Sequence, residues 1–145
     1  AVIDAFPDLK IFIRGLEWER NCRDKKILTR LNATPFYGKD FGNFFRNSRI
    51  SLNVIDDTNY PAANMRFFEI PAAGGLQLSS VCPEMEQIFK SREHILYFSD
   101  TKELITQIDF ALKNPEESRS IRERSHQFVK ENHNYQNRLT KILNS

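Results

Sequence analysis

Short apolar segments alternate along this chain with longer patterns typical of amphipathic helices, and this alternation limits the possible folds more than any other feature. Short strands separated by helices are typical of βαβ units, which build a parallel sheet with helices on its faces. We therefore predict an α/β fold with a Rossmann-like parallel sheet. The expected strands are residues 9–14, 50–54, 76–79 and 95–98. The expected helices are residues 40–47, 64–75 and 83–90, then one after Asp100, one from Pro115 and a last one around residues 135–142.

Two of the helix starts carry clear signals. Asp100 is a good N-cap, and Glu103 follows it at the third helical position. Asn114 is the expected cap of the next helix, because Pro115 stands after it at the first helical position.

The Gly74-Gly75 pair is interpreted as the stop of the helix before it. Pro71 predicts a loosened last turn in that helix, because proline has no N–H to donate.

The chain contains no Gly-x-Gly-x-x-Gly fingerprint, so dinucleotide oxidoreductase chemistry lacks its usual phosphate loop.

Size and charge exclude several classes of protein. The chain has 145 residues, the size of one ordinary domain, and its formal net charge of +2 does not point to nucleic acid. No stretch approaches the roughly 20 apolar residues that cross a membrane. Cys22, Cys82 and the three histidines lack the spacing of a zinc site or a disulfide framework. We expect no metal, no cofactor, no transmembrane segment and a cytoplasmic location.

The carboxyl ends of parallel strands meet at one edge of the sheet, where such folds bind their ligands. The segments directly after strands are therefore the predicted site: Arg14-Gly15, the loop after Val54, and Ser99-Asp100. Phe36-Tyr37-Gly38 is interpreted as a further strand end or turn, and it joins this group.

One segment carries a family resemblance: Asn64-Met65-Arg66-Phe67-Phe68-Glu69, followed by Ala72, Gly74 and Gly75. It is similar to the donor-site segment of group 1 glycosyltransferases, especially the branch that resembles spore-maturation glycosyltransferases. Four further pieces resemble the same family, so that the resemblance covers roughly residues 8 to 143. They are Tyr37-Gly38 with the strand from Ser48 to Asn53, then Glu93 to Asp100 with Glu103-Leu104, then Asn114-Pro115-Glu116, and then Glu131 to Arg138.

The resemblance implies a GT-B enzyme, in which two Rossmann-like domains face each other across a cleft. Residues 1–145 then form a single domain, the C-terminal half that binds a nucleotide-diphosphate sugar. The N-terminal half, which holds much of the acceptor site and usually the catalytic base, lies outside this sequence. The resemblance also implies sugar transfer without a metal. No catalytic residue can be named here, and we expect the fragment alone to bind donor weakly and to transfer nothing.

Three residues of the donor segment suit a nucleotide diphosphate. Arg66 can grip phosphate oxygens through two hydrogen bonds, or it can be an ordinary solvated helix charge. Glu69 matches the family's ribose-binding glutamate, and the alternative is an ion pair with an arginine of the same helix. Asn64 can cap the helix, contact the ligand, or do both. Free N–H groups at the helix start would add to the attraction for phosphate.

Met65, Tyr37 and Gly15 complete the predicted donor site. Met65 belongs to the segment that carries the resemblance. Tyr37 can stack on the nucleotide base, or it can be a plain core or surface aromatic residue. Gly15 can let the backbone approach a phosphate, or it can simply allow a turn after a strand.

One position departs from the family pattern. Many relatives carry a second glutamate eight residues before Glu69, where Pro61 stands in this chain.

A rival interpretation is a non-catalytic α/β interaction module or a receiver-like domain. Asp56-Asp57 follow a strand, as a receiver domain would need, but no lysine or second acid pair stands in matching places.

Overall fold

The computed structural model describes residues 1–15, 18–35, 37–56 and 60–144. The chain divides into two compact units, residues 1–40 and residues 41–145. Among the described residues, the first unit holds a two-stranded parallel sheet and the second a three-stranded parallel sheet, each with helices around it. The predicted α/β class with parallel strands is therefore confirmed.

The strand predicted at residues 9–14 is wrong over most of its length, because its partner strand is very short. In the first unit β1 (Ile13–Arg14) pairs in parallel with β2 (Leu31–Asn32). β2 ends there because the Asn32 side chain accepts a hydrogen bond from the Thr34 N–H at 2.9 Å, which turns the chain. The helices of this unit are α1 (Val2–Ala5), α2 (Trp18–Asn21) and α3 (Lys25–Leu28).

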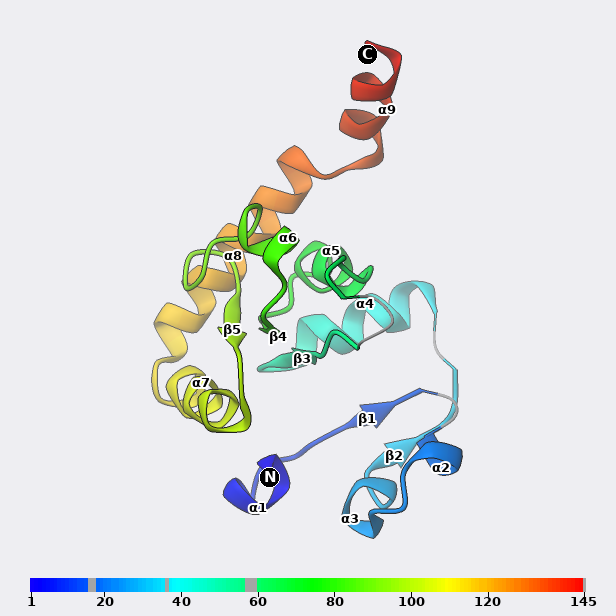
Figure 1. The fold of residues 1–145 in the computed structure, drawn as a ribbon, viewed down its shortest axis with the longest axis vertical. Helices are drawn as coiled ribbons and strands as arrows, with labels where there is room; N and C mark the ends of the chain where they lie inside the picture. The colour runs from blue at the N-terminus through cyan, green and yellow to red at the C-terminus, as the bar shows by residue number, and fades with distance from the viewer. Residues whose placement is uncertain (16–17, 36, 57–59, 145) are drawn as a thin grey trace. The chain divides into compact units, whose positions relative to one another are not determined.

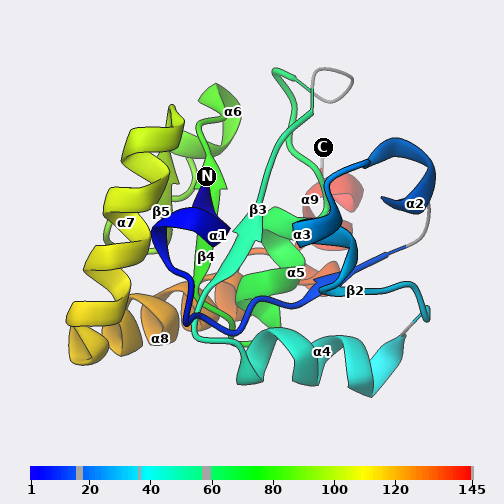
Figure 2. The same ribbon diagram turned by 90° about the horizontal axis from the view of Figure 1, so that it is seen from below.

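The second unit contains the larger sheet (Figure 1). Its strands are β3 (Ser51–Asn53), β4 (Gln77–Ser80) and β5 (Leu96–Phe98), in that order and all parallel, which confirms the predicted strands to within one residue at each end. α7 lies next to β5, and α8 passes behind the sheet toward α5 (Figure 2). The helices are α4 (Gly38–Asn47), α5 (Arg66–Ala72), α6 (Pro83–Glu86), α7 (Thr101–Lys113), α8 (Pro115–Asn132) and α9 (Tyr135–Leu143).

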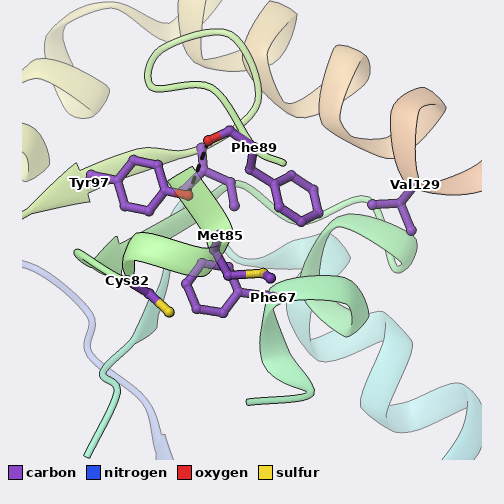
Figure 3. Packing of buried hydrophobic residues seen from close by; sticks show 7 residues of the cluster. Phe67, Cys82, Met85, Phe89, Tyr97 and Val129 are labelled. Atoms are coloured by element: carbon purple, nitrogen blue, oxygen red, sulfur yellow. Dashed lines mark hydrogen bonds between the residues drawn. The ribbon is translucent and has the colours of Figure 1, made fainter. Parts of the chain in front are cut away.

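A buried apolar cluster joins α5, α6, β5 and α8 (Figure 3). The Tyr97 hydroxyl is buried within it and donates a hydrogen bond to the Phe89 carbonyl oxygen at 3.1 Å. Burial raises the pKa of Tyr97 well above its usual range, because the phenolate would lose its hydration. The hydroxyl therefore remains a donor and holds Phe89 against β5. The buried members of the cluster are Phe67, Cys82, Met85, Phe89, Ile95, Tyr97 and Val129.

The helix predicted at residues 83–90 is wrong in its second half. α6 ends at Glu86, and the chain then turns so that Phe89 is completely buried. The Lys90 N–H donates to Nδ1 of His94 at 3.3 Å instead of continuing the helix. The apolar spacing that predicted a longer helix reflects the burial of single side chains, which outweighs local helix propensity.

The predicted cap of α7 is confirmed, because Oδ1 of Asp100 accepts a hydrogen bond from the Glu103 N–H at 2.7 Å. α8 begins at Pro115 as predicted, but the expected capping bond is wrong. The Asn114 amide donates backward to the Phe110 carbonyl oxygen at 2.8 Å, so it holds the end of α7 instead of the start of α8.

α5 ends before the glycine pair, as predicted. The loosened last turn predicted from Pro71 is wrong, because the turn is closed by later residues: Gly74 has φ +76°, and its N–H donates to the Pro71 carbonyl oxygen at 2.8 Å. A Cβ on Gly75 would lie 2.9 Å from the Ile70 side chain and 3.1 Å from the Phe45 carbonyl oxygen. Glycine at position 75 therefore allows the close approach of α4 to α5.

Arg122, Arg124 and His126 of α8 bind main-chain carbonyl oxygens of other segments. These carbonyl groups belong to the end of α4, the last part of α5 and the turn before β5, so α8 ties three segments of the second unit together through their backbone. The pairs are Arg122 with Arg46 at 2.7 Å, His126 with Pro71 at 2.9 Å and Arg124 with Glu93 at 3.1 Å.

α9 confirms the predicted final helix, and its apolar residues face solvent. Tyr135, Leu139 and Ile142 have exposed fractions of 86%, 57% and 69%. Figure 1 shows α9 leading away from the sheet after the end of α8. The spacing of apolar residues here predicts the helix correctly without marking a buried face.

Replacing Gly75 by alanine should destabilise the second unit, whereas replacing Gly42 by alanine should stabilise it. A methyl group at position 75 would overlap Ile70 and the Phe45 backbone, a clash that costs about 1–3 kcal/mol. A Cβ at position 42, inside α4, meets nothing within 4 Å. Alanine there favours the helix by about 1 kcal/mol over glycine. Urea unfolding of both variants measures the difference, and equal effects would contradict the close packing of α4 on α5.

His94 should make the fold less stable in mild acid. Burial lowers the pKa of His94 below its ordinary value of 6.5, although Glu93 acts in the opposite direction. The ring is stacked on Phe128, with centres 4.4 Å apart. The unfolded chain therefore binds a proton at a higher pH than the folded chain. The contribution of a neutral His94 to the free energy of unfolding is therefore complete above pH 6.5. It is lost as the pH falls toward the lower pKa that His94 has in the folded state.

Urea unfolding of the wild type and of His94→Asn on both sides of pH 6.5 tests this expectation. Asparagine keeps an acceptor for the Lys90 N–H but cannot titrate, so the variant should lose less stability on acidification. The same pH profile in both proteins would contradict a buried, neutral His94.

Candidate functional site

Asn53 closes β3 at the carboxyl edge of the larger sheet and is only 4% exposed. Its amide exchanges two hydrogen bonds with Asn64, in which Nδ2 of each residue donates to Oδ1 of the other at 3.1 and 2.9 Å. Nδ2 of Asn53 is also 3.4 Å from Oγ of Ser79 on β4. Because buried amides need partners, this junction fixes the start of α5 against the ends of β3 and β4.

The segment between β3 and α5 is tied to the same edge by two further bonds. The Ile55 N–H donates to Oγ of Ser80 at 2.8 Å. The Ala63 N–H donates to Oε2 of Glu84 at 3.0 Å. Both ends of the predicted site loop after β3 are therefore held, while its residues 57–59 lie outside the described residues.

At the start of α5, the backbone N–H groups from Arg66 to Glu69 donate to oxygens of Asn64 and Met65. Oδ1 of Asn64 accepts from the Arg66 N–H at 3.1 Å, and the Asn64 carbonyl oxygen accepts from the Phe67 N–H at 3.3 Å. The next two N–H groups donate to the Met65 carbonyl oxygen. Asn64 therefore caps the helix, and a part of the helix start in phosphate binding stays a prediction.

Arg66 and Glu69 lie one turn apart on α5 and form an ion pair, in which Nη1 of the guanidinium donates to Oε2 of the carboxylate. The alternative interpretation of Glu69, an ion pair within its own helix, is therefore observed. Both side chains still reach solvent, with exposed fractions of 43% and 32%. The guanidinium carbon also lies 4.9 Å from the centre of the Phe41 ring. Phosphate binding by Arg66 and ribose binding by Glu69 stay predictions.

The other predicted donor residues lie in exposed or turning segments. Met65 stands just before α5 and is 70% exposed. Tyr37 is 79% exposed and precedes α4, whereas Phe36 of the expected strand end lies outside the described residues. Gly15 follows β1 with φ +137°, and a Cβ there would lie 3.3 Å from Nε1 of Trp18. The turn alone accounts for this glycine. Tyr37 and Gly15 belong to the first unit, and their part in donor binding stays a prediction.

Two residues that shape this edge, Asn53 and Glu84, are not among the site residues predicted from the sequence. For Asn53 a signal was available, because a polar amide at the end of a buried strand must find a partner. Nothing local marks Glu84, whose bond to Ala63 spans 21 positions of the chain.

The described residues form two open hollows of about 610 Å³ each, and neither is lined by Arg66 or Glu69. In the ranges that the structure describes, no group of three histidine, cysteine or acidic side chains could hold a metal ion. Within the same ranges, no helix combines the length and apolar character needed to cross a membrane. The first hollow is lined by residues 7–12 and 29–31, and the second by Gln87, Ile88, Phe128, Asn132, His133, Asn137 and Thr140.

Parallel strands flanked by helices, with polar side chains gathered at the carboxyl edge, are typical of α/β proteins that bind ligands at that edge. A family model described as glycosyl transferase-like matches residues 1–144. The chain belongs to this glycosyl transferase-like family, which confirms the predicted glycosyltransferase class and a reaction between a sugar donor and an acceptor. The match favours this class over a receiver-like or purely scaffolding module. No curated protein matches the chain.

Replacing Asn64 by alanine should lower the free energy of unfolding by about 1–2 kcal/mol, because the cap of α5 and a buried amide bond are lost. Asn53→Ala should cost a similar amount. Because both variants break the same bonds, the double variant should cost clearly less than the sum of the two. Asn43→Ala, at an exposed position of α4, is the matched control. Additive losses, measured by urea unfolding, would contradict a coupled amide pair.

Proposed function

We propose that the chain is the donor-binding domain of a metal-independent glycosyltransferase that uses a nucleotide-diphosphate sugar. In this proposal residues 1–145 act as one domain, the C-terminal half of a GT-B enzyme of the spore-maturation branch. Membership of the glycosyl transferase-like family supports the reaction class. The single observation that carries the proposal is the solvent-accessible pair of Arg66 and Glu69 beside the carboxyl edge of the sheet.

The two charges of this pair complement two parts of the ligand. A guanidinium has five N–H donors and can bond phosphate oxygens while it still contacts Glu69. A carboxylate has acceptor sites on both oxygens, so Glu69 can receive bonds from two neighbouring ribose hydroxyls. Asn64 caps the helix that carries both residues, and the cap fixes the position at which this helix begins.

The ion pair does not prevent ligand binding on energetic grounds. An exposed pair of this kind contributes about 0.2–1 kcal/mol. A hydrogen bond to a charged group contributes about 1.5–3 kcal/mol. A diphosphate and a ribose that replace or share the pair would therefore repay its loss.

In the proposed reaction the bond between the anomeric carbon and the distal phosphate oxygen breaks, and its electron pair leaves with the nucleotide diphosphate. Arg66 stabilises the charge that develops on the departing phosphate, which lowers the barrier. The acceptor oxygen forms the new bond to the sugar, and its proton passes to a base of the N-terminal half. The isolated chain therefore binds donor without transferring sugar.

A reducing, cytoplasmic setting belongs to the same proposal. It is supported by Cys22 and Cys82, which are both free thiols in the described chain. Nucleic acid is not among the proposed partners, because the net charge of +2 supplies little attraction for it.

A thermal-shift screen with UDP, GDP and CDP tests the proposal. One of the three should raise the unfolding temperature, because a ligand at 100 times its dissociation constant stabilises the folded state by about 2.7 kcal/mol. Glu69→Ala and Arg66→Ala should abolish most of the shift without unfolding the protein. No shift with any of the three nucleotides would overturn the proposed function.

Glu116 and Arg119 provide the matched control, because they form an exposed ion pair with the same spacing on α8, 3.2 Å apart. Glu116→Ala should lose as little stability as Glu69→Ala and keep the full nucleotide shift. An equal loss of the shift in both variants would mean that general stability, not the site, governs the response.

A further inference from the structure

Arg66 is held from two sides, and one of the two groups belongs to a different helix. Its guanidinium donates to Glu69 within α5, and its Cζ lies 4.9 Å from the centre of the Phe41 ring on α4. A cation within about 6 Å of an aromatic face is attracted by the negative charge of that face. α4 therefore helps to fix a side chain of α5.

The Phe41 ring is itself fixed by packing. Its centre is 4.9 Å from the Phe45 ring centre, and the two planes meet at 80°, an edge-to-face contact. Phe45 is only 8% exposed, and its backbone lies against Gly75 after the end of α5. Nε of Arg46 adds a hydrogen bond to the Ala73 carbonyl oxygen at 3.2 Å. A ring mounted on a buried ring has few other positions, so Phe41 is a firm support.

We propose that Phe41 is a positioning residue for Arg66, one that holds the guanidinium ready for the phosphate oxygens of a nucleoside diphosphate. The inference rests on the function proposed above. Within the described chain, Glu69 accepts one hydrogen bond of the guanidinium, so further N–H groups remain for a ligand. Because the long side chain is already ordered, less conformational entropy is lost when the diphosphate binds.

The ring's face supplies this support, and an aliphatic side chain of similar size does not. Phe41→Leu keeps an apolar side chain against Phe45 but removes the attraction for the cation. Phe41→Tyr keeps the aromatic face and should therefore retain the wild-type affinity for the diphosphate. Phe41→Met, which approximates the volume of phenylalanine, replaces the leucine variant if that one does not fold.

Phe110 provides a matched control elsewhere in the same unit. The Arg92 guanidinium lies over the Phe110 ring, with Cζ 4.2 Å from the ring centre. Phe110→Leu therefore removes the same kind of contact from α7 without changing the proposed donor site. The stability that Phe110→Leu loses measures the general cost of removing a ring, and this cost can be compared with that of Phe41→Leu.

The experiment is calorimetric titration of the full chain and its variants with UDP, GDP and CDP, followed by comparison at the nucleotide that the wild type binds most tightly. Phe41→Leu should weaken binding about two- to fivefold, the change expected for an exposed cation–aromatic contact. Phe41→Tyr and Phe110→Leu should bind like the wild type. In NMR spectra, the Nε–Hε signal of Arg66 is assigned by its loss in Arg66→Lys. Its chemical shift should change in Phe41→Leu and stay the same in Phe110→Leu.

The outcomes separate the two proposals. If the wild type binds a diphosphate and Phe41→Leu binds it equally well, or if the Arg66 signal does not move, the positioning role is overturned and the proposed function stands. If Phe110→Leu weakens binding as much as Phe41→Leu, the effect is general and the positioning role also fails. If the wild type binds none of the three diphosphates, the proposed function fails and the inference fails with it.

Discussion

The paired amides of Asn53 and Asn64 are the contact on which the candidate site depends. Asn53 is almost fully buried at the end of β3, where an unsatisfied amide would cost more than most single contacts contribute. Its bonds to Asn64 and its contact with Ser79 join two strands to the start of a helix. The position of Arg66 follows from this, because Asn64 also caps the turn that begins there. The charged pair is thus mounted on a polar junction rather than on a flexible loop.

A second constraint acts at the other end of α5. Gly75 lets the Phe45 backbone come close to Ile70, and this contact sets the distance between α4 and α5. The aromatic contact from Phe45 to Phe41 then continues to Arg66. One short helix is therefore fixed at its start by amides and at its end by the absence of a side chain. The glycosyl transferase-like family match covers this helix together with the rest of residues 1–144.

Local chemistry allowed the larger sheet and most helices to be predicted. The Asp100 cap was correct because its partner stands three residues away. Features that join distant parts of the chain could not be predicted in the same way. Asn53 and Asn64 are 11 positions apart, and Phe89 leaves its expected helix because the core attracts it. For Glu69 the sequence offered an ion pair and a ligand contact, and the structure contains the ion pair. Both interpretations use the same residues, so no sequence pattern distinguishes them.

α8 binds its neighbours through their main-chain oxygens, at Arg46, Glu93 and Pro71. Every residue type offers such an oxygen, so the side chains at these acceptor positions do not enter the contact. The donor positions differ, because loss of Arg122 or Arg124 removes the bond itself. At these three contacts the restriction on sequence therefore falls on the donor positions of α8, whereas the contacts themselves set no requirement on the side chains of the acceptor residues.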